Sequence, residues 1–261
     1  MLGFKLAEMA TRNRDRLQAH RFEAGLAAAL PSLRQLARRL ERSDADGDEA
    51  LQETLERAWV ARHQLTSAAT VHVWLREILI RAIAGSLRGE LARSLDEVEQ
   101  QQLLLPDVDD PAAVLERAAD DKGLRKALRL LPAADRVSVV LHDGEGLSAG
   151  RVAEALGVSE EAARQRVQRA RGRLIAALAL GAPEPGVAEE GCRSFRLLAQ
   201  ELIDGRLGEE ELTVVEDHLA GCAACSLALQ AAVGVVEVVS GRPLATLPPD
   251  LRERLSPAAD G

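Results

Sequence analysis

The sequence has few aromatic residues and few cysteines, and each shortage excludes a class of protein. Tyrosine is absent, and three phenylalanines and two tryptophans make up only 2% of the 261 residues. Alanine, leucine, arginine and glutamate dominate instead, which favours helix over sheet. Three cysteines, an odd number, suit a disulfide framework poorly and a metal site better. We therefore predict an all-α protein.

The chain also lacks a long apolar run. Its most apolar late stretch, residues 227–239, is shorter than the roughly 20 residues that cross a bilayer, so we expect a buried helix there. Residues 1–21 carry charges throughout and contain no apolar segment typical of a signal peptide. We expect no membrane span and a cytoplasmic location.

Charge is distributed unevenly along the chain. The net charge is −8, which would argue against a nucleic-acid partner if it were spread evenly. Residues 122–178, however, hold 11 basic and 6 acidic residues (+5), whereas residues 179–261 hold 6 and 14 (−8). The basic segment is therefore the candidate for DNA binding, and the acidic end either repels DNA or covers that segment in cis.

Helical periodicity, interrupted by acidic or proline-rich stretches, divides the chain into modules. Apolar residues recur at helical spacing in residues 30–40, 49–62 and 71–88, which predicts a small helical bundle. The expected segments are an N-terminal extension (1–25), this bundle (26–90), an acidic linker (91–121), a helix-turn-helix domain (122–180), a second linker (181–186), a metal-binding helical domain (187–240) and a loose tail (241–261).

Residues 146–174 have the spacing of two short helices joined by a tight turn. Val152, Ala153 and Leu156 place an apolar stripe on the first helix. Gly157 suits the left-handed position that ends this helix, and Ser159 suits the cap of the next one. The pattern predicts a helix-turn-helix whose second helix reads DNA, and an ordinary amphipathic helix with a solvated basic face is the alternative.

The polar face of this second helix carries side chains suited to a major groove. Arginine pairs with guanine or phosphate, and glutamine pairs with base edges. We expect Arg169 to point outward on this polar face, and Arg171 to point outward on its flank. The predicted DNA-binding set is Arg164, Gln165, Arg166, Gln168, Arg169 and Arg171.

All three cysteines lie in the acidic C-terminal module, close to a histidine. His218 and Cys222 are one helical turn apart, and Cys225 follows after two residues. Cys192, 26 residues before His218, completes a set of four ligands that suits tetrahedral zinc. Four protein ligands leave no open position, so we predict a structural Zn²⁺ site and no zinc enzyme. Two buried thiols and a helix-end histidine remain the alternative.

Several of these segments together resemble the extracytoplasmic-function group of bacterial sigma factors. The segment LRKALRLLPAADRVSVVLHDGEGLSAGRVAEALGVSEEAARQRVQRARGRL resembles sigma region 4. The segment EALQETLERAW (49–59) resembles the region 2 helix that docks on the RNA polymerase clamp, and residues 71–88 resemble the following helix, which holds the −10 element. The resemblance implies core RNA polymerase and promoter DNA (−35 and −10 elements) as partners and a role that is not enzymatic.

The resemblance also assigns residues in the first bundle. It implies polymerase binding by Gln52, Glu53 and Arg57, and −10 contacts by Trp74, Arg81 and Arg88. The chain departs from the family pattern at Arg81 and Gly85, where Asn and Asp are usual, and at Val71, where an aromatic residue is usual. A regulatory or interaction protein that keeps the sigma scaffold without initiating transcription is therefore the second hypothesis. Trp59 and Trp74 are expected in the core more than in contacts.

The C-terminal segment CRSFRLLAQELIDGRLGEEELTVVEDHLAGCAAC resembles the zinc-binding domain of anti-sigma factors. The shared features are the upstream cysteine, the turn at Asp204 and Gly205, and the His-Leu before the cysteine pair. The resemblance implies intramolecular contact between the zinc domain and the sigma domains, and modulation in cis. A zinc-dependent redox switch is compatible with either hypothesis. The other histidines, such as His142, show no partner pattern and are assigned no role.

Overall fold

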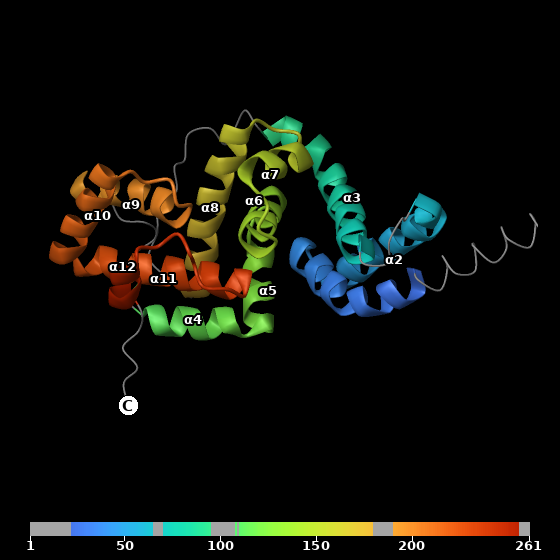
Figure 1. The fold of residues 1–261 in the computed structure, drawn as a ribbon, viewed down its shortest axis with the longest axis horizontal. Helices are drawn as coiled ribbons and strands as arrows, with labels where there is room; N and C mark the ends of the chain where they lie inside the picture. Colours follow the sequence, from blue (N-terminus) through green and yellow to red (C-terminus); the bar gives the residue numbers. More distant parts are fainter. Residues whose placement is uncertain (1–21, 65–69, 95–107, 109, 180–189, 256–261) are drawn as a thin grey trace, which may run out of the picture. The chain divides into compact units, whose positions relative to one another are not determined.

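The computed structural model describes residues 22–64, 70–94, 108, 110–179 and 190–255. Every regular element in these ranges is helical, which confirms the predicted all-α fold (Figure 1). The chain divides into two compact units, residues 1–90 and 91–261, and each is described by itself. Most of the predicted N-terminal extension, the linker 181–186 and the part of the acidic linker at 95–107 lie outside the described residues.

The first unit joins its helices through an aliphatic core and an ion pair. Its described elements are a helix over residues 22–40, α2 (Asp44–Ala61), the 3-10 turn η1 (Arg62–Gln64) and α3 (Val71–Ser94). Ser43 caps α2, because its hydroxyl accepts the backbone N–H of Asp46 at 3.1 Å. Asp48 on α2 accepts two hydrogen bonds from Arg38 on the preceding helix, at 3.1 and 2.8 Å.

The second unit is built around one long helix. The elements that precede and include it are α4 (Pro111–Ala119), α5 (Asp121–Leu130), α6 (Ala133–Val139), the π-helical turn η3 (Val140–Gly144), α7 (Ala149–Leu156) and α8 (Glu160–Ala179). The helices α4 to α7 all contact α8. The predicted stripe of Ala163, Val167, Ala170 and Leu174 is buried in this contact, which confirms the helical register of the sequence pattern.

The acidic C-terminal part adds further helices to the same unit. These are α9 (Glu190–Ile203), α10 (Glu209–Gly221), α11 (Ala223–Ser240) and α12 (Pro249–Leu255). The helix α11 contacts α4, α8, α9, α10 and η3. The C-terminal helices therefore share a core with the helix-turn-helix.

The structure corrects the prediction that residues 91–121 form an acidic linker, because the described part of this range contains a helix. The helix α4 lies within this range, side by side with α11 (Figure 1). Its start follows a standard cap: Asp110 Oδ1 accepts the N–H of Ala113 at 3.0 Å, and Pro111 is the first helical residue. The buried set, Pro111, Val114 and Ala118, is too short to stand out as a stripe among the acidic residues.

The prediction of a loose tail after residue 240 is wrong for the part of the tail that the structure describes. The helix α12 ends the described chain, and Leu247, Leu251 and Leu255 are buried. Leu251 and Leu255 are four residues apart and share one face of α12, and Leu247 is buried just before the helix begins.

The helix α11 is long and apolar enough to cross a membrane by length and composition, and it is the one such helix among the described residues. Half of that stretch is buried within the protein. Length and composition are a weak indication of a membrane span, because the core helix of a soluble protein passes the same test. The burial agrees with the buried helix expected from the sequence.

Replacing Gly234 tests the close packing of α11 on α4. A Cβ at Gly234 would lie 2.3 Å from Cδ2 of Leu115 on α4. We expect Gly234→Val to lower the free energy of unfolding by about 1–3 kcal/mol, because it overpacks this contact. Urea unfolding followed by circular dichroism measures the change. Adding Leu115→Ala to Gly234→Val makes room for the valine and should recover part of the lost unfolding free energy. An equal loss in the single and double variants would contradict the contact.

Candidate functional site

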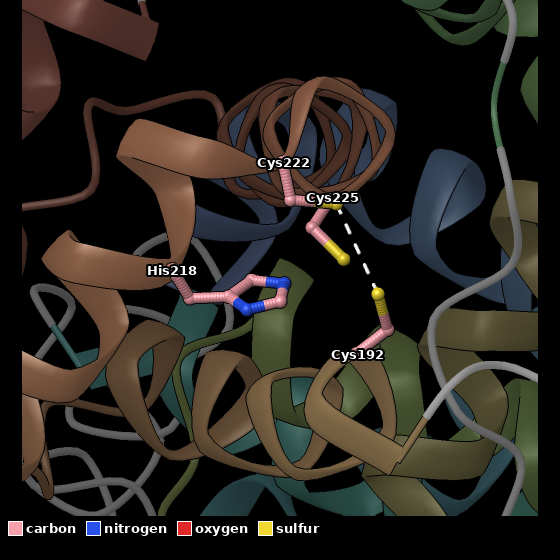
Figure 2. Close-up of side chains that lie close together, drawn as sticks. All are labelled: Cys192, His218, Cys222 and Cys225. Atoms are coloured by element: carbon pink, nitrogen blue, oxygen red, sulfur yellow. Dashed lines mark hydrogen bonds between the residues drawn. The ribbon is translucent and has the colours of Figure 1, made fainter.

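Four potential metal ligands converge in the C-terminal part of the second unit. Cys192 comes from α9, His218 from α10, Cys222 from the junction of α10 and α11, and Cys225 from α11. The ligand atoms all lie within 4.8 Å of one another, and their side chains point inward (Figure 2). The sulfurs of Cys192 and Cys222 are 3.9 Å apart. The structure thus brings together the four residues that the sequence predicted.

Local geometry explains why these ligands meet. The helix α9 ends in a turn at Gly205, whose φ of 69° favours glycine, and the chain then reverses into α10. Cys222 has extended backbone angles and is the N-cap of α11, so α11 starts directly after α10 ends. Phe195 stacks on the His218 ring at 4.8 Å between centroids, which helps to orient the imidazole.

The donor set fits zinc. Three sulfurs and one imidazole nitrogen are ligands that structural Zn²⁺ prefers. Nε2 of His218 is buried and has no protein hydrogen-bond partner, as expected for a nitrogen that binds a metal. Burial raises the pKa of the Cys225 thiol to about 12, whereas the backbone N–H of Cys225 lowers the pKa of Cys222. A bound cation would offset the cost of a buried thiolate at Cys225.

The helix-turn-helix forms as its sequence predicts. Ser148 caps α7, and Gly157 ends it in the left-handed conformation with a φ of 72°. Ser159 caps α8, because its hydroxyl accepts the backbone N–H of Ala162 at 3.2 Å. These caps fix the angle at which α8 leaves the turn.

The polar face of α8 is less open than the sequence suggested. Gln165 is exposed, and Arg164 is partly exposed and paired with Glu160 and Glu161. Arg169 and Arg171 were expected to point outward, and this expectation is wrong because both are buried, at 9% and 3% exposure.

Arg166, also predicted to contact DNA, is buried inside the helix-turn-helix domain. Its guanidinium lies 3.3 Å from Asp135 on α6, and this carboxylate also accepts a bond from Arg173. Asp135 is 1% exposed. The charge of Arg166 therefore compensates a buried carboxylate in the structure described here.

A second buried ion-pair cluster joins α8 to the zinc-ligand part. Arg171 donates two hydrogen bonds to Asp143 of η3, at 2.9 and 2.7 Å. Its Nη1 lies 2.7 Å from Oδ1 of Asp204, directly after α9. One turn earlier on α8, Gln168 donates to Glu201 of α9 at 3.0 Å. We call this set of contacts the seam.

The charges at the seam support one another. Burial alone would lower the pKa of Arg171, but the carboxylate of Asp143 outweighs this effect and raises it. Burial alone would raise the pKa of Asp204, but the nearby His142 and the charge of Arg171 lower it. Burial would also lower the pKa of His142, but Asp204 and Asp143 raise it. The buried charges of Arg171 and Asp204 thus depend on their oppositely charged partners.

Sequence reasoning missed three residues of the seam, Asp143, Glu201 and Asp204, and the adjacent His142. The one sequence signal that pointed to any of these residues was the Asp-Gly turn at Asp204, which indicated the family resemblance and not an ion pair. His142 lies 3.6 Å from Asp204, and its Nδ1 is 2.7 Å from the carbonyl of Leu147. Asp204 is distant from His142 in sequence, so periodicity could not reveal this pair.

In the first unit, the polymerase-binding candidates share an exposed surface of α2. Gln52, Glu53 and Arg57 are all exposed, and Arg57 pairs with Glu53. Trp59, expected in the core, is 46% exposed, and its ring lies against that of Phe22 at 6.0 Å. The guanidinium of Arg62 covers the Trp59 ring at 4.2 Å.

The −10 candidates lie along α3. Trp74 is half-buried with its ring edge toward Phe22, at 6.4 Å between centroids. Arg81 and Arg88 are exposed, and Arg81 pairs with Glu77 at 2.9 Å. Val71, which replaces an aromatic residue of the family pattern, is 1% exposed. A valine at this position fills the core and offers no ring to a base.

Three protein-family models match the chain. The family described as "Sigma-70, region 4" matches residues 122–174, "Sigma2 domain of PhyR" matches residues 26–80, and "Putative zinc-finger" matches residues 192–226. The last range contains all four converging ligands, so the match and the geometry indicate the same site.

Curated relatives and a solved structure match part of the chain. The chain is 34% identical to ECF RNA polymerase sigma factor SigM of Mycobacterium tuberculosis, over 54% of this chain and 69% of that protein. It is 30% identical to RNA polymerase sigma-E factor of Streptomyces coelicolor, over 59% of this chain and 83% of that protein. The sigma factor RpoE in complex with the anti-sigma factor NepR from Bartonella quintana matches 60% of this chain and 96% of that one, at 25% identity and a TM-score of 0.41.

Removing a ligand tests the metal site. We expect the purified chain to hold one Zn²⁺, and His218→Ala or Cys225→Ser to lose it, because each removes one of four ligands. Zinc release followed with a colorimetric chelator measures the content. His63→Ala, at an exposed histidine of the first unit, is the control and should keep its zinc. Equal zinc content in all variants would contradict the site.

Truncating Arg171 tests the seam. Arg171→Ala leaves the buried Asp143 without its arginine partner and leaves Asp204 with only Arg206 and His142, so we expect the free energy of unfolding to fall by about 3–5 kcal/mol. Arg164→Ala removes an exposed pair on the same helix and should cost less than about 1 kcal/mol. Chemical denaturation of both variants at pH 7 measures the difference. A similar loss of unfolding free energy in the two variants would show that the buried cluster does not stabilise the fold.

Proposed function

The chain belongs to the extracytoplasmic-function group of the sigma-70 family of RNA polymerase sigma factors, and from that premise we propose that it directs promoter-specific initiation under restraint by its own zinc module. The sigma part, residues 26–180, would bind core polymerase and promoter DNA. The zinc module, residues 187–240, would hold back the helix that reads the −35 element. The observation that carries the proposal is the seam between α8 and α9.

The seam supports restraint because it uses side chains that DNA would need. Gln168 donates its amide to Glu201, and Arg171 is enclosed by Asp143 and Asp204. The carboxylates of Glu201 and Asp204, which lie beside α8, would also repel phosphate. Contact with DNA through Gln168 or Arg171 therefore requires the zinc module to move away from this end of α8.

The charges of the two parts are complementary. Residues 122–178 carry a net charge of +5, and residues 179–261 carry −8. These opposite charges favour association of the two segments. The acidic segment therefore competes with DNA for the basic helix. Residues near the start of α8, Arg164 and Gln165, remain at the surface and would make the first contacts with bases or phosphates.

The zinc ion would have a structural role. Three helices meet at the four ligands, and α9 also carries Glu201 and leads into Asp204. Zinc would hold α9 at a fixed angle to α10 and α11, because a tetrahedral site fixes its ligands in space. Loss of zinc would then loosen the acidic side of the seam.

The first unit would supply polymerase binding and the −10 contacts. Gln52, Glu53 and Arg57 form an exposed polar surface on α2, which suits docking on the polymerase clamp. Arg81 and Arg88 suit contacts with the DNA backbone, and the half-buried Trp74 would supply a ring for stacking.

The buried Val71 and the bare surface at Gly85 favour a second candidate function. Gly85 is exposed and has no side chain, so this position offers no side-chain hydrogen bond to a base. The candidate is a regulatory protein that binds polymerase on a sigma scaffold without opening promoters. Specific run-off transcripts from purified core polymerase and a promoter library would contradict it.

Opening the seam tests the restraint. We expect Asp204→Lys to increase run-off transcripts and binding of promoter DNA, because the new charge repels Arg171 from the zinc module. Glu210→Lys makes the same charge change on an exposed position of α10 and should leave both unchanged. A chain truncated after Gly181 is a second test that removes the module.

At equal protein concentration, Asp204→Lys and the truncated chain should each yield more run-off transcript than the full chain. Transcription that stays equal in Asp204→Lys, the truncated chain and the full chain would contradict restraint in cis. Circular dichroism on each variant shows whether the helices persist.

A further inference from the structure

A cavity of about 540 Å³ lies next to the seam in the second unit. One side is formed by the loop before α7, which includes Gly146, Leu147 and Ser148. The other side is formed by α11 and by the segment from Arg242 to Thr246 that follows it. The cavity therefore has walls from both the helix-turn-helix and the zinc module.

Much of this wall is apolar. Leu147, Ile203, Val236 and Leu244 line the cavity together with Pro243. The volume falls within the range of small-molecule sites, which combine apolar walls with a few polar groups. A compact organic molecule fits this space better than a bare ion does.

Several polar groups of the cavity already have partners inside the protein. Arg171 is held by Asp143 and Asp204, and the hydroxyl of Thr246 donates to the carbonyl of Ile203 at 3.0 Å. Ser148 accepts the N–H of Arg151 as the cap of α7. These groups define the shape of the cavity and have little capacity left for a ligand.

Arg242 differs from these groups. Its guanidinium lies beside Gly146 at the rim, where a Cβ would come within 2.6 Å of Nη2. Gly146 also has a φ of 69°, so both the space and the backbone favour glycine there. Within the described ranges, no carboxylate forms an ion pair with Arg242, which is exposed and lines the cavity. A cation at the rim of an apolar cavity suits the head of an amphipathic anion.

We propose that this cavity binds a small organic monocarboxylate, with its carboxylate on Arg242 and its apolar body against Leu147, Ile203 and Val236. The positive end of α7, which starts at Ala149, adds to the attraction. Asp143 and Asp204 also line the cavity and repel a second negative charge, so polyanions are disfavoured. The ligand contacts both modules and stabilises their docked arrangement; this regulatory consequence rests on the proposed restraint in cis.

The test uses benzoate and hexanoate as probes, with benzamide and hexanamide as uncharged analogues of the same shape. Binding to the full chain is measured by ligand-observed NMR titration at pH 7. We expect at least one carboxylate to bind saturably and its amide to bind about tenfold more weakly or not at all, because the amide lacks the charge-assisted bond to Arg242.

Variants locate the site. Arg242→Gln should weaken binding of the carboxylate about tenfold, and Arg242→Lys should restore part of it. Arg151→Gln removes an exposed arginine of α7 that does not line the cavity, so it should leave binding unchanged. No saturable binding by either acid, equal binding of acid and amide, or equal binding to Arg242→Gln would each overturn the proposal.

A transcription assay separates this proposal from the restraint in cis. The carboxylate should lower run-off transcription by the full chain and leave run-off transcription by Asp204→Lys unchanged. The binding site is judged by the NMR titration alone. Carboxylate binding that depends on Arg242 would support the site even if the Asp204→Lys assay contradicted restraint.

Discussion

The arrangement of the second unit depends on the buried ion pairs of Arg171. This guanidinium is nearly inaccessible to solvent and is bound by Asp143 on one side and Asp204 on the other. A buried charge is tolerated only with well-placed partners, so the three groups hold η3, α8 and the end of α9 in one geometry. The same contacts cover part of the helix proposed to read the −35 element.

The sequence predicted the local elements well and the partners of the arginines poorly. Ser148, Gly157 and Ser159 act over one or two turns, and all three have the capping or turn geometry expected from their residue types. The four zinc ligands could be found from spacing because a tetrahedral site constrains residue type and distance together. Arg166 and Arg171 were misjudged because their carboxylate partners lie 31 and 28 residues away in sequence.

Two segments that were expected to lack structure are helices, and in both the cause is packing against a distant part of the chain. The helices α4 and α12 are short, and each buries only a few apolar side chains. Their stability comes from a surface that another part of the chain supplies, since short helices are marginal alone. For α4 that surface is α11, where Gly234 allows Leu115 to approach closely. A helix of the zinc module thus completes the core beside the region 4 helices.

The central claim is that the zinc module and promoter DNA compete for one end of α8. The most direct test places a photo-crosslinking amino acid at Gln168 and compares the free chain with a transcribing complex on core polymerase. The account predicts a crosslink to the α9 segment around Glu201 in the free chain, replaced by a crosslink to promoter DNA in the complex. A crosslink to α9 that persists at full yield during transcription would contradict it.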